Sequence, residues 1–284
     1  MKSKIIIPTE FMGVPVSQET MDKVLANAEV KKERTRNVTP ASANVGDKSE
    51  YIILEGRQHG SYSYDDLIVC MHRLGFGPDV EKEAGGLGLN VSNISKEKDG
   101  TDYIGNINWE NALKLNLALG NVTLTPRQGI DLMIDLKEGI RGAKKLYDAK
   151  GKEVGAGRIK RMYDEIWQVR EPLRGEWLDA KFLDNNGMNI LYGHELDNRG
   201  NLKPNYNQPL EGCLAQDGLV EIGSVNWQGM FTKASNKGNF SFYCPKNGKV
   251  ARFGAGSDRA NLNCNGNPTN LNDWLGVRAA RAKN

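Results

Sequence analysis

The sequence contains few of the residues from which metal centres and nucleophilic active sites are most often built. Among its 284 residues there are four Cys and three His. The Cys residues form no C-x-x-C pair, and His59, His72 and His194 show no metal-ligand spacing, which disfavours a His-rich metal site and a Cys/His catalytic pair. We interpret the Cys residues as mostly buried thiols, because free Cys packs as a small hydrophobic side chain. A disulfide such as Cys244 to Cys264 stays open, since spacing alone does not establish pairing.

The sequence also lacks long apolar runs and a large excess of charge of one sign. No apolar segment approaches the ~20 residues of a membrane-spanning helix, so we expect no membrane insertion. The opening segment Met1–Pro8 is basic, but its apolar part is too short for a signal peptide. We expect a chain that is cytoplasmic when synthesised, and association with a virion or a cell surface stays open. The 38 basic residues are balanced by 35 acidic ones, so no nucleic-acid partner is expected.

Helix signals are present in the first two thirds of the chain. Asn108 is a good N-cap and Gly120 a good stop for one expected helix. Thr125 and Gln128, with Pro between them, form a capping box that predicts the start of a second helix. Apolar residues at three- and four-residue spacing predict a third helix over Arg158–Arg170. The Pro two residues later would end it.

Other early segments are predicted with less regular patterns. Ser63 as N-cap and an apolar run before Gly75 predict a helix. Gly85–Gly88 is expected to be a loop, and it lacks the Gly-Lys-Ser/Thr of a phosphate-binding loop. We expect a short helix over Met21–Val30, and we interpret the basic run Lys31–Arg36 as a solvated surface.

Strand signals dominate the last third. Tyr51–Leu54 already reads as a strand, and after Glu176–Phe182 short strands alternate with turns to the C-terminus. Phe240–Pro245 and Lys249–Phe253 are predicted to form a hairpin through Asn247-Gly248. Helices early and strands late predict an α+β fold.

The C-terminal segment combines strand alternation with a residue that forms strands poorly. Six of the fourteen residues from Asn261 to Trp274 are Asn. Period-two alternation predicts one packed and one free face. Asn has low strand propensity, so folding alone does not account for its density on the free face. The inward residues are expected to be Phe253, Ala255, Ser257, Leu262 and Cys264.

Three segments of the chain carry a family resemblance. The first runs from Asn108-Trp109-Glu110 to Leu124-Thr125-Pro126-Arg127, the second from Tyr147–Lys152 to Glu176–Ala180, and the third from Val250–Phe253 to Leu275–Ala280. In this order they resemble the variable proteins of diversity-generating retroelements, in the lineage known from archaeal viruses and small-genome microbes. The first segment is similar to the helix pair that opens the formylglycine-generating-enzyme type of C-type lectin fold. The resemblance spans roughly residues 100 to 284.

The resemblance implies a domain organisation. Residues 49–284 would be a C-type lectin-like domain with a variable region at about 250–284. Residues 1–48 have no counterpart in the family, and their weak, polar pattern predicts an N-terminal extension, partly disordered. The segment Leu275–Ala280 would return as a buried central strand. Trp109, Trp167 and Trp177 would belong to the scaffold.

The resemblance also implies a function. In such proteins, reverse transcription with errors at adenines replaces a C-terminal repeat, and Asn codons of the AAC type are preferred targets. The product would be a ligand-binding protein with a hypervariable surface, without enzymatic activity, metal or cofactor. Its unknown ligand would be a protein or surface molecule of another cell or virus. The implied ligand-binding residues are Arg252, Gly254, Gly256, Asp258, Asn261, Asn263, Asn265, Asn270, Leu271, Asn272, Asp273 and Trp274.

Trp274 and two other functions stay open. Trp274 is either the main contact residue of the ligand surface or a core residue of the last strand. A structural or tail-associated protein of a virus or mobile element is the first alternative function. An oxidase of the formylglycine-generating-enzyme branch is the second, but it would need a reactive Cys pair near the C-terminus, where Cys264 stands alone. We interpret Cys264 as a buried thiol.

Acidic residues give weak signals for chemistry. Asn270–Trp274 suggests a calcium-binding loop only faintly. We interpret Glu165, Glu171, Glu176 and Asp179 as surface and turn charges rather than paired catalytic carboxylates.

Overall fold

The structure is a computed structural model that describes residues 10–11, 14–15, 47–91, 94–96, 102–169, 173–256 and 258–283. The chain divides into two compact units, Met1–Ala43 and Asn44–Asn284. In the first unit, strands β1 (Glu10–Phe11) and β2 (Val14–Pro15) pair antiparallel. The helix expected over 21–30, the basic run 31–36 and most of the N-terminal extension lie outside the described residues.

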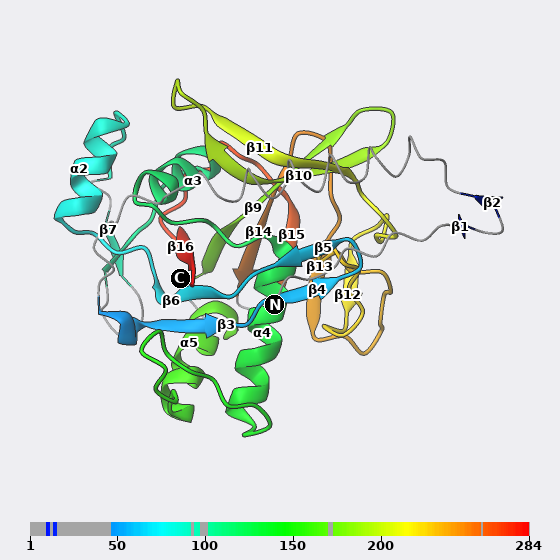
Figure 1. The fold of residues 1–284 in the computed structure, drawn as a ribbon, viewed down its shortest axis with the longest axis horizontal. Helices are drawn as coiled ribbons and strands as arrows, with labels where there is room; N and C mark the ends of the chain where they lie inside the picture. Colours follow the sequence, from blue (N-terminus) through cyan, green and yellow to red (C-terminus); the bar gives the residue numbers. More distant parts are fainter. Residues whose placement is uncertain are drawn as a thin grey trace. The chain divides into compact units, whose positions relative to one another are not determined.

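The second unit is built on a ten-stranded, mostly antiparallel sheet (Figure 1). Within the described residues, its strands follow the order β12 (Gly218–Val220), β13 (Phe240–Tyr243), β15 (Ala260–Gly266), β14 (Val250–Ala255), β9 (Arg174–Asp184), β16 (Leu275–Ala282), β6 (Leu67–Arg73), β3 (Tyr51–Leu54). The pairs β13–β15 and β9–β16 are parallel. The C-terminal half of β9 also pairs with β10 (Met188–Leu196), which pairs with β11 (Leu202–Pro209). Two small ribbons are formed by β4 (Arg57–His59) with β5 (Tyr62–Tyr64), and by β7 (Ile94–Lys96) with β8 (Asp102–Ile104).

Two of the helices, α3 and α4, begin at a side-chain cap, whereas α2 and α5 begin after a Gly without one. Besides the short 3-10 helix η1 (Lys48–Glu50), the described residues contain α2 (Pro78–Gly86), α3 (Trp109–Ala118), α4 (Pro126–Ile140) and α5 (Ala156–Trp167). The side chain of Asn108 accepts the backbone N–H of Asn111 at the start of α3. Thr125 and Gln128 form the predicted capping box at the start of α4. The expected third helix is α5, which starts two residues before Arg158 and ends at Trp167.

Two helix-and-loop predictions are wrong. The segment expected as a helix from Ser63 to Gly75 forms β5 and β6 instead. Strand β6 lies between β16 and β3 in the sheet. Leu67, Ile68 and Val69 are all buried, so the start of β6 lacks the alternation that marks a strand with one open face. The expected loop Gly85–Gly88 is in part the end of α2, which includes Gly85 and Gly86.

The predicted hairpin through Asn247-Gly248 is also wrong. A turn is present, and Gly248 adopts φ +73°, which favours Gly. However, β13 and β14 do not pair, because β15 lies between them and pairs with both. The turn leads into β14 and is hydrogen-bonded to β9, since the backbone N–H of Gly248 donates to Phe182 O at 2.8 Å. A short turn fixes where the chain reverses but not which strand occupies the neighbouring position.

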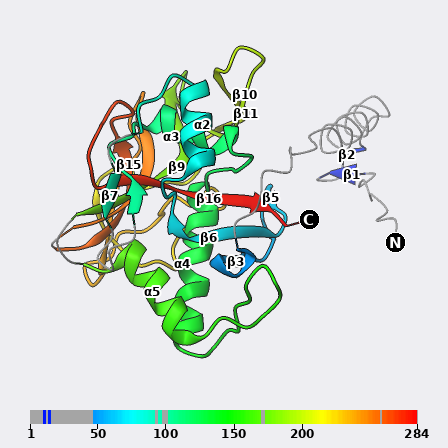
Figure 2. The ribbon, with the colours of Figure 1, turned by 90° about the vertical axis from the view of Figure 1, so that its left-hand side faces the viewer.

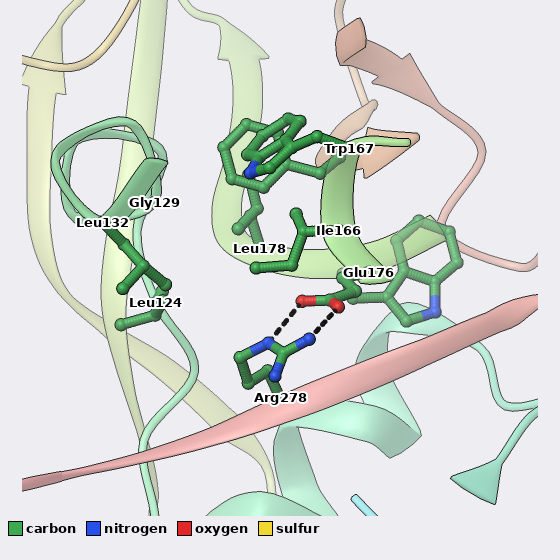
Figure 3. A pocket seen from close by; sticks show the side chains of 10 residues that line it. Leu124, Gly129, Leu132, Ile166, Trp167, Glu176, Leu178 and Arg278 are labelled. Atoms are coloured by element: carbon green, nitrogen blue, oxygen red, sulfur yellow. Dashed lines mark hydrogen bonds and ion pairs between the residues drawn. The ribbon is translucent and has the colours of Figure 1, made fainter. Parts of the chain in front are cut away.

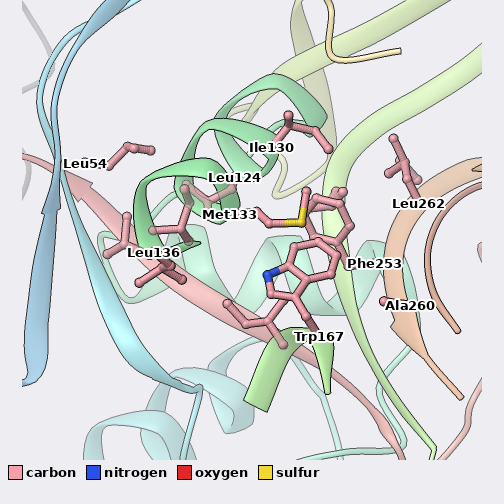
Figure 4. Packing of buried hydrophobic residues seen from close by; sticks show 14 of the residues in the cluster. Leu54, Leu124, Ile130, Met133, Leu136, Trp167, Phe253, Ala260 and Leu262 are labelled. Atoms are coloured by element: carbon pink, nitrogen blue, oxygen red, sulfur yellow. The ribbon is translucent and has the colours of Figure 1, made fainter. Parts of the chain in front are cut away.

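Two hydrophobic cores lie on opposite faces of the sheet. Alternation along β9 separates them: Trp177 belongs to the core under α2 and α3, and Leu178 to the core under α4 and α5. Figure 2 shows α2 and α3 at the top, α4 and α5 at the bottom, with β16 and β6 between them. The larger core joins α4 to the C-terminal strands, with Phe253 lying beside Trp167 and Met133 (Figure 4). The described part of the chain is therefore α+β, with β16 buried in the sheet as expected.

Candidate functional site

Strand β15 has the predicted alternation of packed and open side chains. Leu262 and Cys264 are fully buried at 0% exposure. Asn261, Asn263 and Asn265 alternate with them and are half-exposed. The two inward side chains belong to the core under α4 and α5, so the Asn side chains lie on the opposite face of the sheet. The sequence prediction of an inner and an outer face is confirmed for this strand.

The outer face extends across the neighbouring strands. Arg252 of β14 lies opposite Asn263 on one side and Trp177 of β9 on the other. Tyr243 of β13 is the parallel partner of Asn263 and is exposed. Over β9 and β16 the same face is covered by α3, whereas over β13, β14 and β15 it carries partly open side chains. We call the outward residues of these last three strands, together with the ring of Trp274 beside Arg252, the open face.

Sequence reasoning missed Tyr243 as a member of the open face. Its strand alternates in burial: Phe240 and Phe242 are buried, Ser241 is half-buried and Tyr243 is exposed. That alternation is visible in the sequence. The wrong hairpin prediction hid its meaning, because it paired this strand with β14 rather than with β15.

Gly254 differs from the prediction. It was expected to be open, but it is buried because the side chain of its cross-strand partner Asn261 lies over it. A Cβ atom at Gly254 would lie 2.9 Å from Asn261 Oδ1. Gly254 is therefore covered by the side chain of Asn261 and becomes accessible only when that side chain moves. Gly256 is half-buried, Asp258 is exposed, and Ser257 is not among the described residues.

The inward residues of β14 are held tightly by α4 and α5. The ring of Phe253 makes an edge contact with Trp167, with centroids 4.3 Å apart. A Cβ atom at Gly129 of α4 would lie 2.4 Å from Phe253 Cε2, so the helix needs Gly at this position. Phe253 and Ala255 thus belong to the scaffold, as predicted.

Arg252 occupies an unusual position on the open face. Its guanidinium carbon lies 5.0 Å from the ring centroid of Trp274 and 6.0 Å from that of Trp177. Its Nη1 atom is buried and has no hydrogen-bond partner among the described residues. Burial lowers the pKa of Arg252, and the opposing influence of Tyr243 is smaller.

Trp274 belongs partly to the scaffold and partly to the open face. It precedes β16 rather than lying in it, and its side chain is half-buried. Its carbonyl oxygen accepts Arg73 Nη1 at 2.9 Å and the N–H of Gly175 at 3.0 Å. A Cβ atom at Gly175 would lie 2.8 Å from Trp274 Cζ3, so the ring rests on that Gly. The ring of Trp274 also lies beside the guanidinium of Arg252.

The loop before β16 is anchored through its backbone. The carbonyl of Asn272 accepts the N–H of Asn106 at 2.9 Å, and the carbonyl of Asp273 accepts Tyr103 Oη at 2.9 Å. Asn270 and Asn272 are half-exposed and Asp273 is exposed. Leu271, at 56%, is the most exposed of the large hydrophobic residues in the described part of the chain. Main-chain atoms of Asn272 and Asp273 therefore anchor the loop to the segment that contains Tyr103 and Asn106.

The interior contains a small pocket, lined mainly by residues of the core under α4 and α5 (Figure 3). Glu176 and Arg278 line it and form a two-pronged ion pair, at 2.9 Å from Nε and 2.5 Å from Nη2. The cavity volume is about 10 Å³. This is room for about one water molecule, far below the ~300 Å³ of a small-molecule site. The open face, and not this pocket, is therefore the candidate site.

Two carboxylates interpreted as surface charges are buried. Glu176 is paired with Arg278, and Asp179 accepts both the backbone N–H and the Nδ1 of His194. Their partners are 102 and 15 residues away in the sequence, so no local pattern reveals them. Glu165 is half-buried, and Glu171 lies outside the described residues.

The remaining reactive groups are enclosed or paired. Burial raises the pKa of Cys264 well above its ordinary value, in agreement with its interpretation as a packed thiol. All four Cys residues are free, so the open question of a Cys244–Cys264 disulfide is answered in the negative. No group of three or more His, Cys, Asp or Glu within the described ranges is arranged to hold a metal ion. Trp109, Trp167 and Trp177 are core residues, as expected.

A further ionic network ties β4 and β5 to α4. Asp131 accepts hydrogen bonds from Arg127, from Tyr64 Oη at 2.8 Å and from His59 Nε2 at 2.8 Å. Arg57 Nη1 lies 3.1 Å from the same carboxylate. Burial alone would raise the pKa of Asp131, but these hydrogen bonds outweigh it and hold the pKa below its usual value. The network is saturated by its own members and has a structural role.

Comparison with known proteins adds no relative. No protein-family model, no curated protein and no solved structure matches the chain. Among the helices that the structure describes, none is both long and apolar enough to cross a membrane.

Proposed function

We propose that this protein is a ligand-binding protein whose open face is a hypervariable surface, diversified by adenine-directed mutagenic retrohoming of a retroelement. The observation that carries the proposal is the division of β15 into buried Leu262 and Cys264 and half-exposed Asn261, Asn263 and Asn265. The outward set can change while the inward set keeps the fold. The α+β architecture, with a mostly antiparallel sheet whose last eight strands follow the helices, supports the further proposal that the domain is a C-type lectin fold of the formylglycine-generating-enzyme type.

Energetics support a surface that tolerates replacement. Substitutions on a surface away from caps, ion pairs and buried networks usually change stability by about 0.5 kcal/mol or less. The side chains of Asn261 and Asn265 form no hydrogen bond with another described residue. The loop of Leu271 and Asp273 is held by main-chain atoms. The side chains of Asn261 and Asn265 therefore contribute little to the fold, which supports a role in binding.

The chemistry of the open face resembles that of binding surfaces that adapt to different ligands. Aromatic side chains supply large contact areas at low entropic cost, and small polar side chains supply adaptable hydrogen bonds. Trp274 and Tyr243 provide the first, and the Asn residues of β15 the second. We propose a protein or surface molecule of another cell or virus as the ligand.

An oxidase function receives less support from the thiols. Cys264 is the only Cys of the C-terminal segment, and it is fully buried with its sulfur 3.6 Å from Met230 Sδ. A nucleophilic thiol needs thiolate character and access to solvent. Burial opposes both. We therefore propose a function without catalysis.

Sequencing of the gene's surroundings tests the proposal directly. A near-copy of the codons for residues 250–284 should lie beside a reverse-transcriptase gene, and the two copies should differ only at adenines of the template. The differences should fall on codons for the outward residues and spare those for Leu262 and Cys264. Codons for residues 174–184, which form β9, provide the control and should have no second copy. A neighbourhood with neither a copy nor a reverse transcriptase would contradict the retroelement proposal.

A further inference from the structure

Arg252 is the one residue of the open face whose own environment is unfavourable. Its side chain is half-buried between Trp177 and Trp274, and it forms no ion pair or hydrogen bond with another described residue. A guanidinium carries five N–H donors in a planar fork. Folding removes some of these donors from water and gives them no acceptor in exchange.

The two indole rings restrict the position of the guanidinium but accept no hydrogen bond from its N–H groups. A cation near an aromatic ring is attracted by the ring's quadrupole, but this contact uses no N–H donor. Gly175 makes room for the Trp274 ring, whose main chain is fixed by Arg73. The ring is therefore positioned by the scaffold, and it restricts where the guanidinium can lie. The result is a pre-positioned cation whose donor fork is unused.

The neighbours of Arg252 on the open face are neutral or aromatic. Asn263 and Tyr243 follow it across the sheet. The acidic residues of the C-terminal segment, Asp258 and Asp273, are exposed, and neither is among the groups that shift the pKa of Arg252. A single positive charge thus stands in polar, uncharged surroundings.

We propose that Arg252 is the anchor of the ligand site and that it binds a carboxylate of a protein partner, an Asp or Glu side chain placed against Trp274. The proposal rests on the proposed function of the open face. A carboxylate matches the guanidinium fork with two parallel N–H···O bonds. It would also supply acceptors to the N–H donors of the half-buried guanidinium that remain accessible. The bound carboxylate would be largely enclosed by the partner and by the two rings, where such a pair discriminates strongly against neutral groups.

The charge distribution favours a protein over a nucleic acid. Binding of a polyanion depends on several basic residues, each neutralising one phosphate. Here Arg252 and the exposed Arg259 are accompanied in the C-terminal segment by Asp258 and Asp273, and the whole chain carries a net charge of only +3. The site is therefore suited to one carboxylate within a mostly neutral contact surface.

Selection from a phage-displayed library of random 12-residue peptides tests the proposal. The probe is the library itself, panned on the full chain and, in parallel, on the variant Arg252→Gln. Peptides selected by the native protein should share one Asp or Glu. Its replacement by Asn or Gln should weaken binding to the native protein about 30-fold or more, as expected when one partner of a desolvated ion pair is lost. The same replacement should have no effect on binding to Arg252→Gln.

Three control variants separate the possible outcomes. Arg259→Gln removes an exposed charge from the same segment and should leave binding within about twofold. Arg252→Lys keeps the charge without the planar fork and should give an intermediate loss. Asn263→Trp places a large side chain beside Arg252 and should block the face.

Each outcome is informative. One outcome would overturn the role of Arg252 and leave the binding function intact. In it, Asn263→Trp blocks the selected peptides, but they show no preference for acidic residues and bind Arg252→Gln as well as the native protein. Peptides insensitive to Asn263→Trp, or no selected peptides, would overturn both proposals. Binding of a 20-nucleotide single-stranded DNA at 0.15 M salt that requires Arg252, without acidic peptides, would replace the protein partner by a nucleic acid.

Discussion

The division of β15 into scaffold and open face predicts opposite results for neighbouring residues. Two variants make the comparison: Asn261→Thr with Asn265→Thr, which changes the outer face, and Leu262→Ala, which changes the inner face. The Asn side chains make no hydrogen bond with another described residue, and Leu262 is completely buried. The residues alternate along one strand, so local backbone geometry is the same for both variants.

The expected magnitudes differ severalfold. Thr has a higher strand propensity than Asn on a scale that spans about 1 kcal/mol, which offsets the lost cover of Asn261 over Gly254. The double variant should therefore change the free energy of unfolding by about 1 kcal/mol or less. Leu262→Ala removes a buried side chain and leaves a cavity, at a cost of about 2–5 kcal/mol. In a domain of this size, 1 kcal/mol shifts Tm by about 2–4 °C.

Thermal unfolding followed by circular dichroism measures both effects. The double Asn variant should unfold within about 4 °C of the native protein, and Leu262→Ala about 4–20 °C lower. Asn263→Thr is an internal control, because Asn263 Oδ1 accepts the N–H of Asn265 at 2.9 Å. It should lose about 1 kcal/mol, between the other two. A double Asn variant as unstable as Leu262→Ala would refute the division, since the Asn side chains would then be structural.

Two further predictions concern the scaffold beneath the open face. In urea denaturation, Gly129→Ala should destabilise the protein by about 1–2 kcal/mol, because crowding against Phe253 outweighs the gain in helix propensity. Gly157→Ala in α5, where nothing lies within 4 Å of the added Cβ atom, should stabilise it by up to about 1 kcal/mol. Equal effects of the two substitutions would contradict the packing of Phe253 on Gly129. The depressed pKa of Asp131 contributes stability that is present above its unfolded value of about 4 and is lost as pH falls through the folded pKa. Urea denaturation from pH 7 to pH 3 should therefore show a smaller loss of stability for Asp131→Asn than for the native chain, and parallel curves would exclude this carboxylate as a source of acid sensitivity.

Local sequence patterns predicted the structure correctly where a feature depends on residues that are close together in the chain. Asn108 and the Thr125–Gln128 box start α3 and α4 because a cap needs only side chains within one helical turn. The inner and outer faces of β15 followed from alternation, since a strand with one open face keeps period two in its sequence. These features are properties of short segments.

Local signals failed where several elements meet. The first three residues of β6 are all buried in the interior of the sheet, so the apolar run there carries no period that separates it from a helix. The Asn247-Gly248 turn was recognised, but β15, which follows later in the chain, takes the place beside β13. Glu176 was interpreted as a surface charge because its partner Arg278 is 102 residues away.

The sequence by itself determined that the C-terminal segment has an inner and an outer face and that its Asn residues lie on the outer one. The tertiary structure decided which strands share that face, and it brought Tyr243 beside Asn263 and left Arg252 between two Trp rings. It also covered Gly254 with Asn261 and divided Trp274 between scaffold and surface. The physical reason is that alternation is fixed by the backbone of one strand, whereas burial, charge pairing and access to a ligand depend on neighbours that only long-range packing supplies.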